Sequence, residues 1–416
     1  MDDISVLVCD DSALMRNLIS NIIDKTPGMH VVGKAMNGQF CLDKIPLVHP
    51  DVIVLDIEMP VMNGVQFLEE RKRQRIDVPV VILSSIATTG ADVTIRCLEL
   101  GASDFLTKPN GSITNDLSSV ATRLVELISS YGGSYARRHG KRVYNTELYS
   151  ESLDKLSAAV RRTRASGTAP ALNRAGNDAA AESNSAQVSS SIERAFASLR
   201  STASQFSVTS KSPAVIEPLR KGGSIDVIAI GISTGGPNAL RDVFKFIDPH
   251  IKQPILVVQH MPAGFTKEFA ASLNNICPLE VKEAEDGDLV KSGRVLIAPG
   301  NYHIYVEKKP LGAIVRLSQE PQRNGHRPSV DYLFESVAAL YQNHALGVIM
   351  TGMGRDGAAM LAEMRRQGAW TLGQDEASSI VYGMPKVAYE MGAVQKQVAL
   401  RDMADEISKL AREHKF

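Results

Sequence analysis

The sequence lacks the features of disulfide-bonded and membrane-spanning proteins. It has only 4 cysteines, and none forms a C-x-x-C pair, which argues against a disulfide framework or a zinc site. No apolar run approaches the roughly 20 residues that a membrane helix needs. The acidic Asp2 and Asp3 stand where a signal peptide would carry basic residues. We therefore expect a cytoplasmic protein without membrane insertion.

The chain also lacks a net charge. Lys plus Arg and Asp plus Glu both total 46, so no global basic field is present to attract nucleic acid, and we expect no nucleic-acid partner. With 416 residues, of which 44% are hydrophobic, the chain is long enough for two or three globular domains.

Short apolar runs alternate with helix-length amphipathic stretches in both halves of the chain. This rhythm predicts βα repeats and two α/β domains, each a doubly wound parallel sheet, over residues 1–128 and 224–416. Between them, residues 129–223 are rich in Ser and Ala and predict a flexible linker, with short helices at 152–163 and 191–200. The expected strands are residues 4–9, 30–35, 52–57, 78–85 and 102–108 in the first domain, and 225–231, 254–260, 294–300 and 345–350 in the second.

Polar residues end several strands of the first domain. Asp10 and Asp11 follow one strand and Asp56 ends another, which brings three carboxylates to one edge of the sheet. Such a cluster suits Mg²⁺, which binds carboxylate oxygens and bridges them to phosphate. Ser84 supplies a hydroxyl and Lys108, before Pro109, a positive charge from further strands. Each residue alone could be an ordinary helix cap, but together they indicate a phosphoryl-transfer site.

A glycine-rich turn follows the first strand of the second domain. The sequence GISTGGP places Ser233 in a G-x-S-x-G spacing, which lets the backbone turn sharply and exposes a nucleophile. A turn of this kind also serves phosphate or dinucleotide binding, so the segment alone leaves both interpretations open.

Two further residues favour a nucleophilic site. His260 ends the next strand and Asp356 follows the strand at 345–350, so in a parallel sheet both share an edge with Ser233. Alternatively, the histidine is structural and Asp356 caps a helix. Asp286 and Asp288 are rival acids, but the turn EDGD that holds them is typical of solvated turn chemistry.

The first-domain pattern resembles the receiver domains of two-component signalling, which have a flavodoxin-like fold. The resemblance implies Asp56 as phosphoacceptor, and Mg²⁺ bound by Asp10, Asp11 and Asp56 with the Glu58 carbonyl nearby. Ser84 and Lys108 would sense the phosphoryl group, and Phe105 takes the aromatic switch position, where many relatives carry Tyr.

The second domain resembles the catalytic domain of the chemotaxis methylesterase (CheB) family in the segments GISTGGP, VVQHMPAGFT, HRPSVDYLF and TGMGRDGA. The resemblance implies Ser233 as nucleophile, His260 as general base and Asp356 as its partner, with Thr234 and Met353 as oxyanion donors. The substrates would be glutamyl γ-methyl esters of chemoreceptors, and the same acyl chemistry would allow deamidation of receptor glutamines. The implied phosphodonor is the chemotaxis histidine kinase, and the esterase needs no cofactor.

Two other functions compete with this interpretation. Receiver domains often control DNA-binding domains, but the second half shows strand alternation rather than a basic recognition helix. A nucleotide-binding module would also use the glycine-rich turn. Separately, the chain order Ser, His, Asp differs from the Ser, Asp, His order of ordinary α/β-hydrolases, which disfavours an ordinary lipase or esterase. The linker is longer than the family's usual short connector. If flexible, it weakens the restraint that the resemblance implies, in which the unphosphorylated receiver covers the active site. Alternatively, its helical segments dock and restore that contact.

Overall fold

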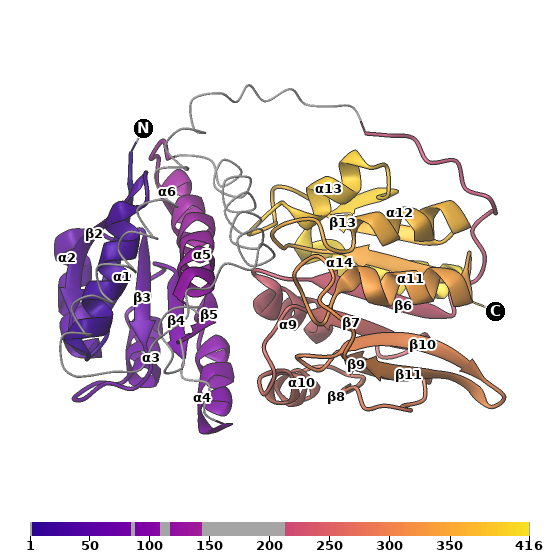
Figure 1. Ribbon diagram of the computed structural model, residues 1–416, viewed down its shortest axis with the longest axis horizontal. Helices are drawn as coiled ribbons and strands as arrows, with labels where there is room; N and C mark the ends of the chain where they lie inside the picture. Colours follow the sequence, from indigo (N-terminus) through magenta and orange to yellow (C-terminus); the bar gives the residue numbers. More distant parts are fainter. Residues whose placement is uncertain (1, 85–87, 109–116, 144–212, 416) are drawn as a thin grey trace, which may run out of the picture. The chain divides into compact units, whose positions relative to one another are not determined.

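The computed structural model describes residues 2–84, 88–108, 117–143 and 213–415 (Figure 1). These residues form two compact units, each built around its own parallel sheet. None of the described helices combines the length and the apolar composition that crossing a bilayer requires.

The first unit contains a five-stranded sheet in the order β2-β1-β3-β4-β5, with every neighbouring pair parallel. This is the flavodoxin-like doubly wound order, and it confirms the expected fold. From β1 the chain adds β2 on one side of the sheet and then β3 on the other, so the strand order reverses between β1 and β3. The carboxyl ends of these two strands therefore flank the crevice where ligands bind in such sheets. The strands are β1 (Ile4–Cys9), β2 (Met29–Ala35), β3 (Val52–Asp56), β4 (Val80–Ser84) and β5 (Asp104–Thr107).

Helices connect these strands. Helix α2 packs beside α3, and α1 beside α5. Since β-α-β crossovers are right-handed, these two pairs cover opposite faces of the sheet. The helices are α1 (Ala13–Lys25), α2 (Gly38–Val48), α3 (Gly64–Arg73), α4 (Thr88–Glu99) and α5 (Leu117–Leu127).

The last helix of this unit continues past residue 128, where the linker was expected to begin. A π-helical turn, η1 (Ile128–Gly132), joins α5 to α6 (Gly133–Arg138) without a break. Tyr131 is buried there, and its hydroxyl donates to the carbonyl of Ser103, 2.8 Å away. The chain then returns to the sheet, where Lys141 Nζ lies 2.7 Å from Asp51 Oδ2. The first unit therefore extends by the helical residues 129–138 and a short return segment beyond the expected boundary.

The second unit contains a seven-stranded parallel sheet in the order β14-β13-β12-β6-β7-β9-β8. The four expected strands are β6, β7, β9 and β12, and the doubly wound arrangement is confirmed. An antiparallel hairpin, β10-β11, was not expected. The strands are β6 (Val227–Ile232), β7 (Ile255–Gln259), β8 (Glu280–Glu283), β9 (Arg294–Ile297), β10 (His303–Lys309), β11 (Gly312–Ser318), β12 (Ala345–Ile349), β13 (Trp370–Gln374) and β14 (Lys396–Val398).

Two groups of helices sandwich this sheet. Helix α9 packs against α10 and α14, whereas α12 packs against α11 and α13 (Figure 1). A core of aliphatic side chains from β6, β12, α11 and α12 lies between the sheet and the helix group of α11, α12 and α13. Its burial stabilises the strand ends in one fixed arrangement. The helices are α9 (Gly236–Phe246), α10 (Thr266–Asn274), α11 (Val330–Tyr341), α12 (Ala358–Gln367), α13 (Met384–Glu390) and α14 (Leu400–Glu413).

The second unit begins before residue 224, the boundary expected from the sequence. The backbone N–H groups of Ala214, Leu219 and Gly223 donate to carbonyls of Glu390, Arg366 and Asn343, respectively. Residues 213–223 therefore belong to this unit. The expected short helices at 152–163 and 191–200 lie outside the described residues.

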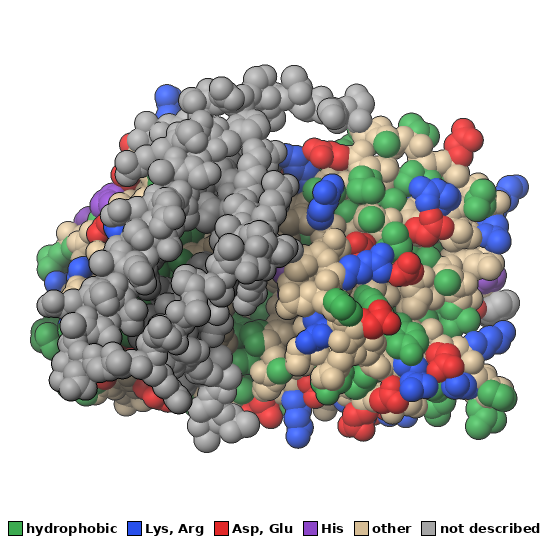
Figure 2. Space-filling model, viewed as in Figure 1, with side chains coloured by type: hydrophobic (Ala, Val, Ile, Leu, Met, Phe, Trp, Pro, Cys, Tyr) green, Lys and Arg blue, Asp and Glu red, His purple; other side chains and the backbone are tan. Residues whose placement is uncertain are grey.

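Charges of both signs are mixed on the described surface. On the face shown in Figure 2, blue Lys and Arg side chains alternate with red Asp and Glu side chains over the second unit. Several charged side chains of the described residues form ion pairs, such as Arg316 with Asp286 and Glu307. The described residues on this face form no continuous basic surface of the kind that nucleic acids require.

Candidate catalytic and phosphorylation sites

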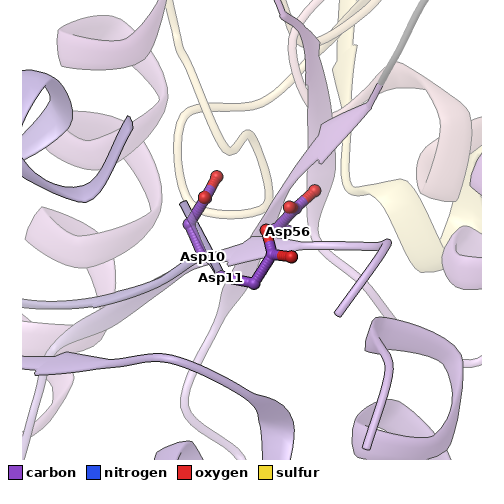
Figure 3. A group of neighbouring side chains, drawn as sticks. All are labelled: Asp10, Asp11 and Asp56. Atoms are coloured by element: carbon purple, nitrogen blue, oxygen red, sulfur yellow. The ribbon is translucent and has the colours of Figure 1, made fainter. Parts of the chain in front are cut away.

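The carboxyl ends of β1 and β3 bring three carboxylates together. One oxygen each from Asp10, Asp11 and Asp56 lies within 4.8 Å of the others (Figure 3). Asp10 and Asp56 are buried and Asp11 is exposed, so the cluster opens to solvent on one side. The adjacency of β1 and β3 in the sheet produces the juxtaposition that the sequence predicted.

Lys108 lies over this cluster. Its Nζ is 2.7 Å from Asp56 Oδ2 and 3.2 Å from Asp10 Oδ2. Burial raises the pKa of Asp56, the Lys108 ammonium opposes that rise, and the Asp10 carboxylate adds to it. Burial alone would lower the pKa of Lys108, but its contacts with Asp56 and Asp10 raise it, so the ammonium stays charged.

A buried oxygen of Asp10 also supports binding of a magnesium ion at this cluster. Asp10 Oδ2 is buried and accepts no hydrogen bond among the described residues, and the Lys108 ammonium lies 3.2 Å from it as an ion-pair partner. A buried carboxylate oxygen without a hydrogen bond is costly, and a metal ion would add to the stabilisation that Lys108 gives it. Three carboxylate oxygens with an open, solvated side are the ligand set that Mg²⁺ prefers.

The structure describes three of the other residues expected at this site. Ser84 ends β4, is buried, and its carbonyl accepts a hydrogen bond from the Lys108 N–H. Phe105 on β5 is 8% exposed, so its ring is packed inward. Glu58 lies two residues after Asp56 on the same edge, and Pro109 lies outside the described residues.

The second unit places its candidate residues at the ends of three adjacent strands. Ser233 follows β6, which lies between β7 and β12, and these two strands lead to His260 and Asp356. The strand order reverses between the parallel strands β6 and β12, so Ser233 lies at the topological switch point of this sheet. Gly235, with a φ of 79°, turns the backbone from β6 into α9 and keeps Ser233 on a tight elbow.

Ser233, His260 and Asp356 form a continuous hydrogen-bonded chain. Ser233 Oγ is 3.0 Å from His260 Nδ1, and His260 Nε2 is 2.8 Å from Asp356 Oδ2. Because the carboxylate accepts a hydrogen bond at Nε2, the neutral ring carries its proton there and presents the Nδ1 lone pair to the serine hydroxyl. This arrangement can remove the serine proton during nucleophilic attack.

The Asp356 carboxylate is buried but fully hydrogen-bonded. Oδ2 accepts from His260 and the Val330 N–H, and Oδ1 accepts from Asn324 Nδ2 and Ser329 Oγ. Burial alone would raise the pKa of Asp356, but His260 and the hydrogen bonds from Asn324 and Ser329 hold it well below its ordinary value. Asp356 is therefore ionised throughout the neutral range and can stabilise a protonated His260.

Sequence reasoning missed the support for this pair. Asn324 Nδ2 lies 2.7 Å from Asp356 Oδ1 and 2.6 Å from Asp331 Oδ2, so the amide bridges two buried carboxylates. The His326 ring stacks on His260 with centroids 3.8 Å apart. Both residues belong to a turn closed by hydrogen bonds between Arg323 and His326. The motif HRPSVDYLF pointed to this region, but no spacing rule identifies a turn that folds back onto another strand.

The rival acids lie elsewhere. Asp286 accepts hydrogen bonds from Arg316 and the Leu317 N–H, and Asp288 pairs with Lys282. Both carboxylates therefore connect the turn before β9 to neighbouring strands. The carboxylate beside His260 is that of Asp356.

The expected oxyanion donors flank Ser233. Thr234 is buried next to it, and its carbonyl accepts a hydrogen bond from Thr351 Oγ1. Gly352 packs so closely that a Cβ added there would lie 2.8 Å from Ser233 Cβ, which brings the loop that contains Met353 against the nucleophile. The Ser233 N–H is already bonded to the Thr351 carbonyl.

A receiver fold joined to an α/β unit with a Ser-His-Asp arrangement defines a response regulator whose output domain is a hydrolase. Residues 6–117 match the family model of the response regulator receiver domain, and residues 228–407 match that of the CheB methylesterase. The chain is 52% identical over 413 residues to the protein-glutamate methylesterase/protein-glutamine glutaminase of Treponema denticola, covering 99% of this chain and 100% of that relative. It is 50% identical over 414 residues to the protein of the same description from Treponema pallidum, covering 99% and 98%. The chain belongs to the CheB family of protein-glutamate methylesterases.

Proposed function

We propose that this enzyme hydrolyses the γ-methyl esters of glutamyl residues on chemoreceptors, with Ser233 as the nucleophile. The observation that carries the proposal is the hydrogen-bonded chain from Ser233 Oγ through His260 to Asp356, with links of 3.0 and 2.8 Å. Such a chain suits acyl transfer because a poor nucleophile gains an adjacent, oriented base.

The reaction takes two steps. His260 Nδ1 accepts the Ser233 proton as Oγ attacks the ester carbonyl, and the same proton then passes to the leaving methoxide, which departs as methanol. Water, activated by His260, then hydrolyses the glutamyl acyl-enzyme to a free carboxylate and Ser233. Backbone N–H groups at Thr234 and Met353 stabilise the oxyanion, and the packing of Gly352 against Ser233 supports this assignment.

The same site also deamidates receptor glutamines. A glutamine and a glutamyl methyl ester yield the same acyl-enzyme, and only the leaving group, ammonia or methanol, differs. The description of both Treponema relatives includes the glutaminase activity, which supports this second reaction.

The receiver controls the hydrolase through phosphorylation of Asp56 by the chemotaxis histidine kinase. Bound Mg²⁺, held by Asp10, Asp11 and Asp56, would neutralise negative charge on the carboxylates and the phosphoryl oxygens. Lys108 supplies the second positive charge, and its 2.7 Å contact with Asp56 supports this role. We place the enzyme in the cytoplasm, because the four cysteines are free thiols, which a reducing compartment maintains.

Methanol release from methylated receptor tests the proposal. We expect the wild-type enzyme to release methanol, and Ser233→Ala to lower kcat by about 10⁶-fold, as losing a nucleophile does in comparable triads. The fold should remain intact, because the N–H and carbonyl of Ser233 keep their bonds to Thr351 and Gly236 without the hydroxyl. A folded, active Ser233→Ala enzyme would exclude Ser233 as the nucleophile.

A further inference from the structure

Gln259, the last residue of β7, connects the backbones of the nucleophile and the base. Its side chain is 2% exposed, and Nε2 lies 3.0 Å from the Ser233 carbonyl oxygen and 3.1 Å from the His260 carbonyl oxygen. Only N–H groups can satisfy two carbonyl oxygens, which defines the orientation of the amide. One amide group therefore holds Ser233 and His260 at the same time.

This bridge stands where the main-chain ladder between β6 and β7 ends. Gln259 pairs with Ile232, and the last ladder bond runs from the His260 N–H to the Ile232 carbonyl, 3.2 Å away. Beyond it the Ser233 backbone turns into α9, and His260 leads into the loop before α10. The Gln259 amide adds one more connection between the diverging chains, at the level of the reacting side chains.

The amide oxygen of Gln259 gains nothing from this arrangement. Oε1 is buried and accepts no hydrogen bond from the described residues. It lies against Gly236, where an added Cβ would be 1.9 Å away. A glutamine selected for stability would satisfy both ends of its amide, because a buried unpaired acceptor destabilises the folded state.

We propose that Gln259 is a positioning residue for the hydrolase reaction, and that Gly236 is a glycine because the Gln259 amide needs the space. The inference rests on the proposed function for the identity of the nucleophile and base. By fixing both carbonyls, Gln259 sets the distance between Ser233 Oγ and His260 Nδ1, on which proton transfer depends.

The first test is Gln259→Met in the full-length protein, which keeps the length of the side chain and removes both N–H donors. We expect kcat for methanol release to fall about 10- to 100-fold, as small misplacements of catalytic groups do, with KM unchanged. Phosphonylation of Ser233 by a fluorophosphonate probe should slow by the same factor. The melting temperature should stay within about 3 °C of wild type, because the orphaned acceptor is removed together with the donors.

Gln253→Met is the matched control. Gln253 is also buried and bonds only to backbone groups, with Nε2 donating to the Ala411 carbonyl and Oε1 accepting from the Lys252 N–H. Because both ends of this amide are satisfied away from the site, Gln253→Met should lower the melting temperature and leave kcat unchanged. Wild-type kcat in Gln259→Met, or a loss of kcat that follows the melting temperature in both variants, would overturn the proposal.

A double-mutant cycle approaches the same bridge from its other side. Alanine suits the first turn of a helix, but at position 236 its methyl group would displace the Gln259 amide. Gly236→Ala should therefore slow Ser233 phosphonylation about as much as Gln259→Ala, and the double variant should be no slower than Gln259→Ala alone. Additive losses would show that Gly236 acts independently of Gln259, which contradicts the proposed bridge. This cycle decides the matter if Gln259→Met does not fold.

The probe also separates this inference from the proposed function. Phosphonylation reports the geometry of Ser233 and His260 without requiring a receptor. If wild-type enzyme releases no methanol but probe labelling still depends on Gln259, the substrate assignment fails and the positioning role stands. If methanol is released and labelling is insensitive to Gln259, the positioning role fails alone.

Discussion

The side chain of Asp356 acts on the reaction through His260, so its loss should be less damaging than loss of the nucleophile. We expect Asp356→Asn to retain roughly 10- to 100-fold more kcat than Ser233→Ala, because the hydroxyl and imidazole remain while the ring loses its preferred tautomer. Methanol release under saturating substrate measures this. Wild-type activity in Asp356→Asn would redirect attention to Asp331, the other buried carboxylate on the Asn324 amide.

The lowered pKa of Asp356 also predicts how stability depends on pH. A carboxyl group with a pKa below its unfolded-state value stabilises the fold at pH above that value, which is about 3.9, and loses this contribution as the pH falls toward the folded-state pKa. The free energy of unfolding of the wild type should therefore fall more steeply below about pH 4 than that of Asp356→Asn. Urea unfolding between pH 3 and 7 measures both slopes. Parallel slopes would show that Asp356 is not the ionised, hydrogen-bonded group described above.

Two aspartates of the receiver should respond differently to removal. Asp56→Ala should abolish phosphate incorporation from a small phosphodonor, because the proposed phosphoacceptor, whose carboxylate lies 2.7 Å from Lys108, is removed. Asp11→Ala should still accept phosphate, but only at higher Mg²⁺ concentration, since an exposed ligand is lost while Asp56 remains. Intact-mass measurement across a Mg²⁺ titration distinguishes the two. Phosphate on Asp56→Ala would refute the phosphoacceptor assignment.

The positions of residues that end strands could be predicted from the sequence. Side chains that bond to a different segment of the chain could not be predicted in this way. Ser233, His260 and Asp356 each follow an apolar run, and parallel strands share one edge, so their meeting was predictable. The bond from Asn324 to Asp356 depends on the course of a long loop. Gln259 drew no attention inside the expected strand at 254–260, because nothing in the local pattern shows that its amide bridges two carbonyls.

At the scale of elements, hydrophobic runs identified the central strands and failed at the edges. The buried strands β1, β3, β6 and β12 read as continuous aliphatic segments. The hairpin β10-β11 is partly exposed and alternates polar with apolar residues across a two-residue turn, and β14 has only 3 residues, so neither gave a strong signal.

The π-helical turn after α5 makes a prediction of its own. Gly132 packs against the sheet so closely that a Cβ would lie 2.7 Å from Ile4 Cγ2 and 2.9 Å from Val52 Cγ1. Gly132→Ala should lower the free energy of unfolding of the receiver by roughly 1–3 kcal/mol through overpacking. Gly133→Ala is the control, since its Cβ would be 3.3 Å or more from its neighbours and alanine favours helix by up to about 1 kcal/mol. Equal effects of both substitutions in chemical denaturation would show that the close packing of Gly132 is not maintained in solution.

At the scale of the whole molecule, composition indicated two domains but not their limits. The first unit ends later than its composition suggests. Its last part, α6 and the return segment to Lys141, is held by a few polar contacts and contains no apolar run that would mark it as folded. Likewise, residues 213–223 join the second unit through backbone hydrogen bonds, which leave no trace in composition. A catalytic fragment designed on this structure should therefore begin at residue 213.

That fragment tests how strongly the receiver restrains the hydrolase. Residues 144–212 join the two described units. The sequence predicts a flexible linker there, and a flexible tether of that length would give an effective concentration well below the millimolar values of short linkers. We therefore expect partial autoinhibition. Residues 213–416 should release methanol faster than unphosphorylated full-length enzyme, and a phosphodonor should accelerate the full-length enzyme but not the fragment. Full-length Asp56→Ala is the matched control, because it keeps the tether and should stay at the slow rate with phosphodonor present. If fragment and unphosphorylated full-length enzyme work at equal rates and phosphodonor changes neither, the receiver does not restrain this active site.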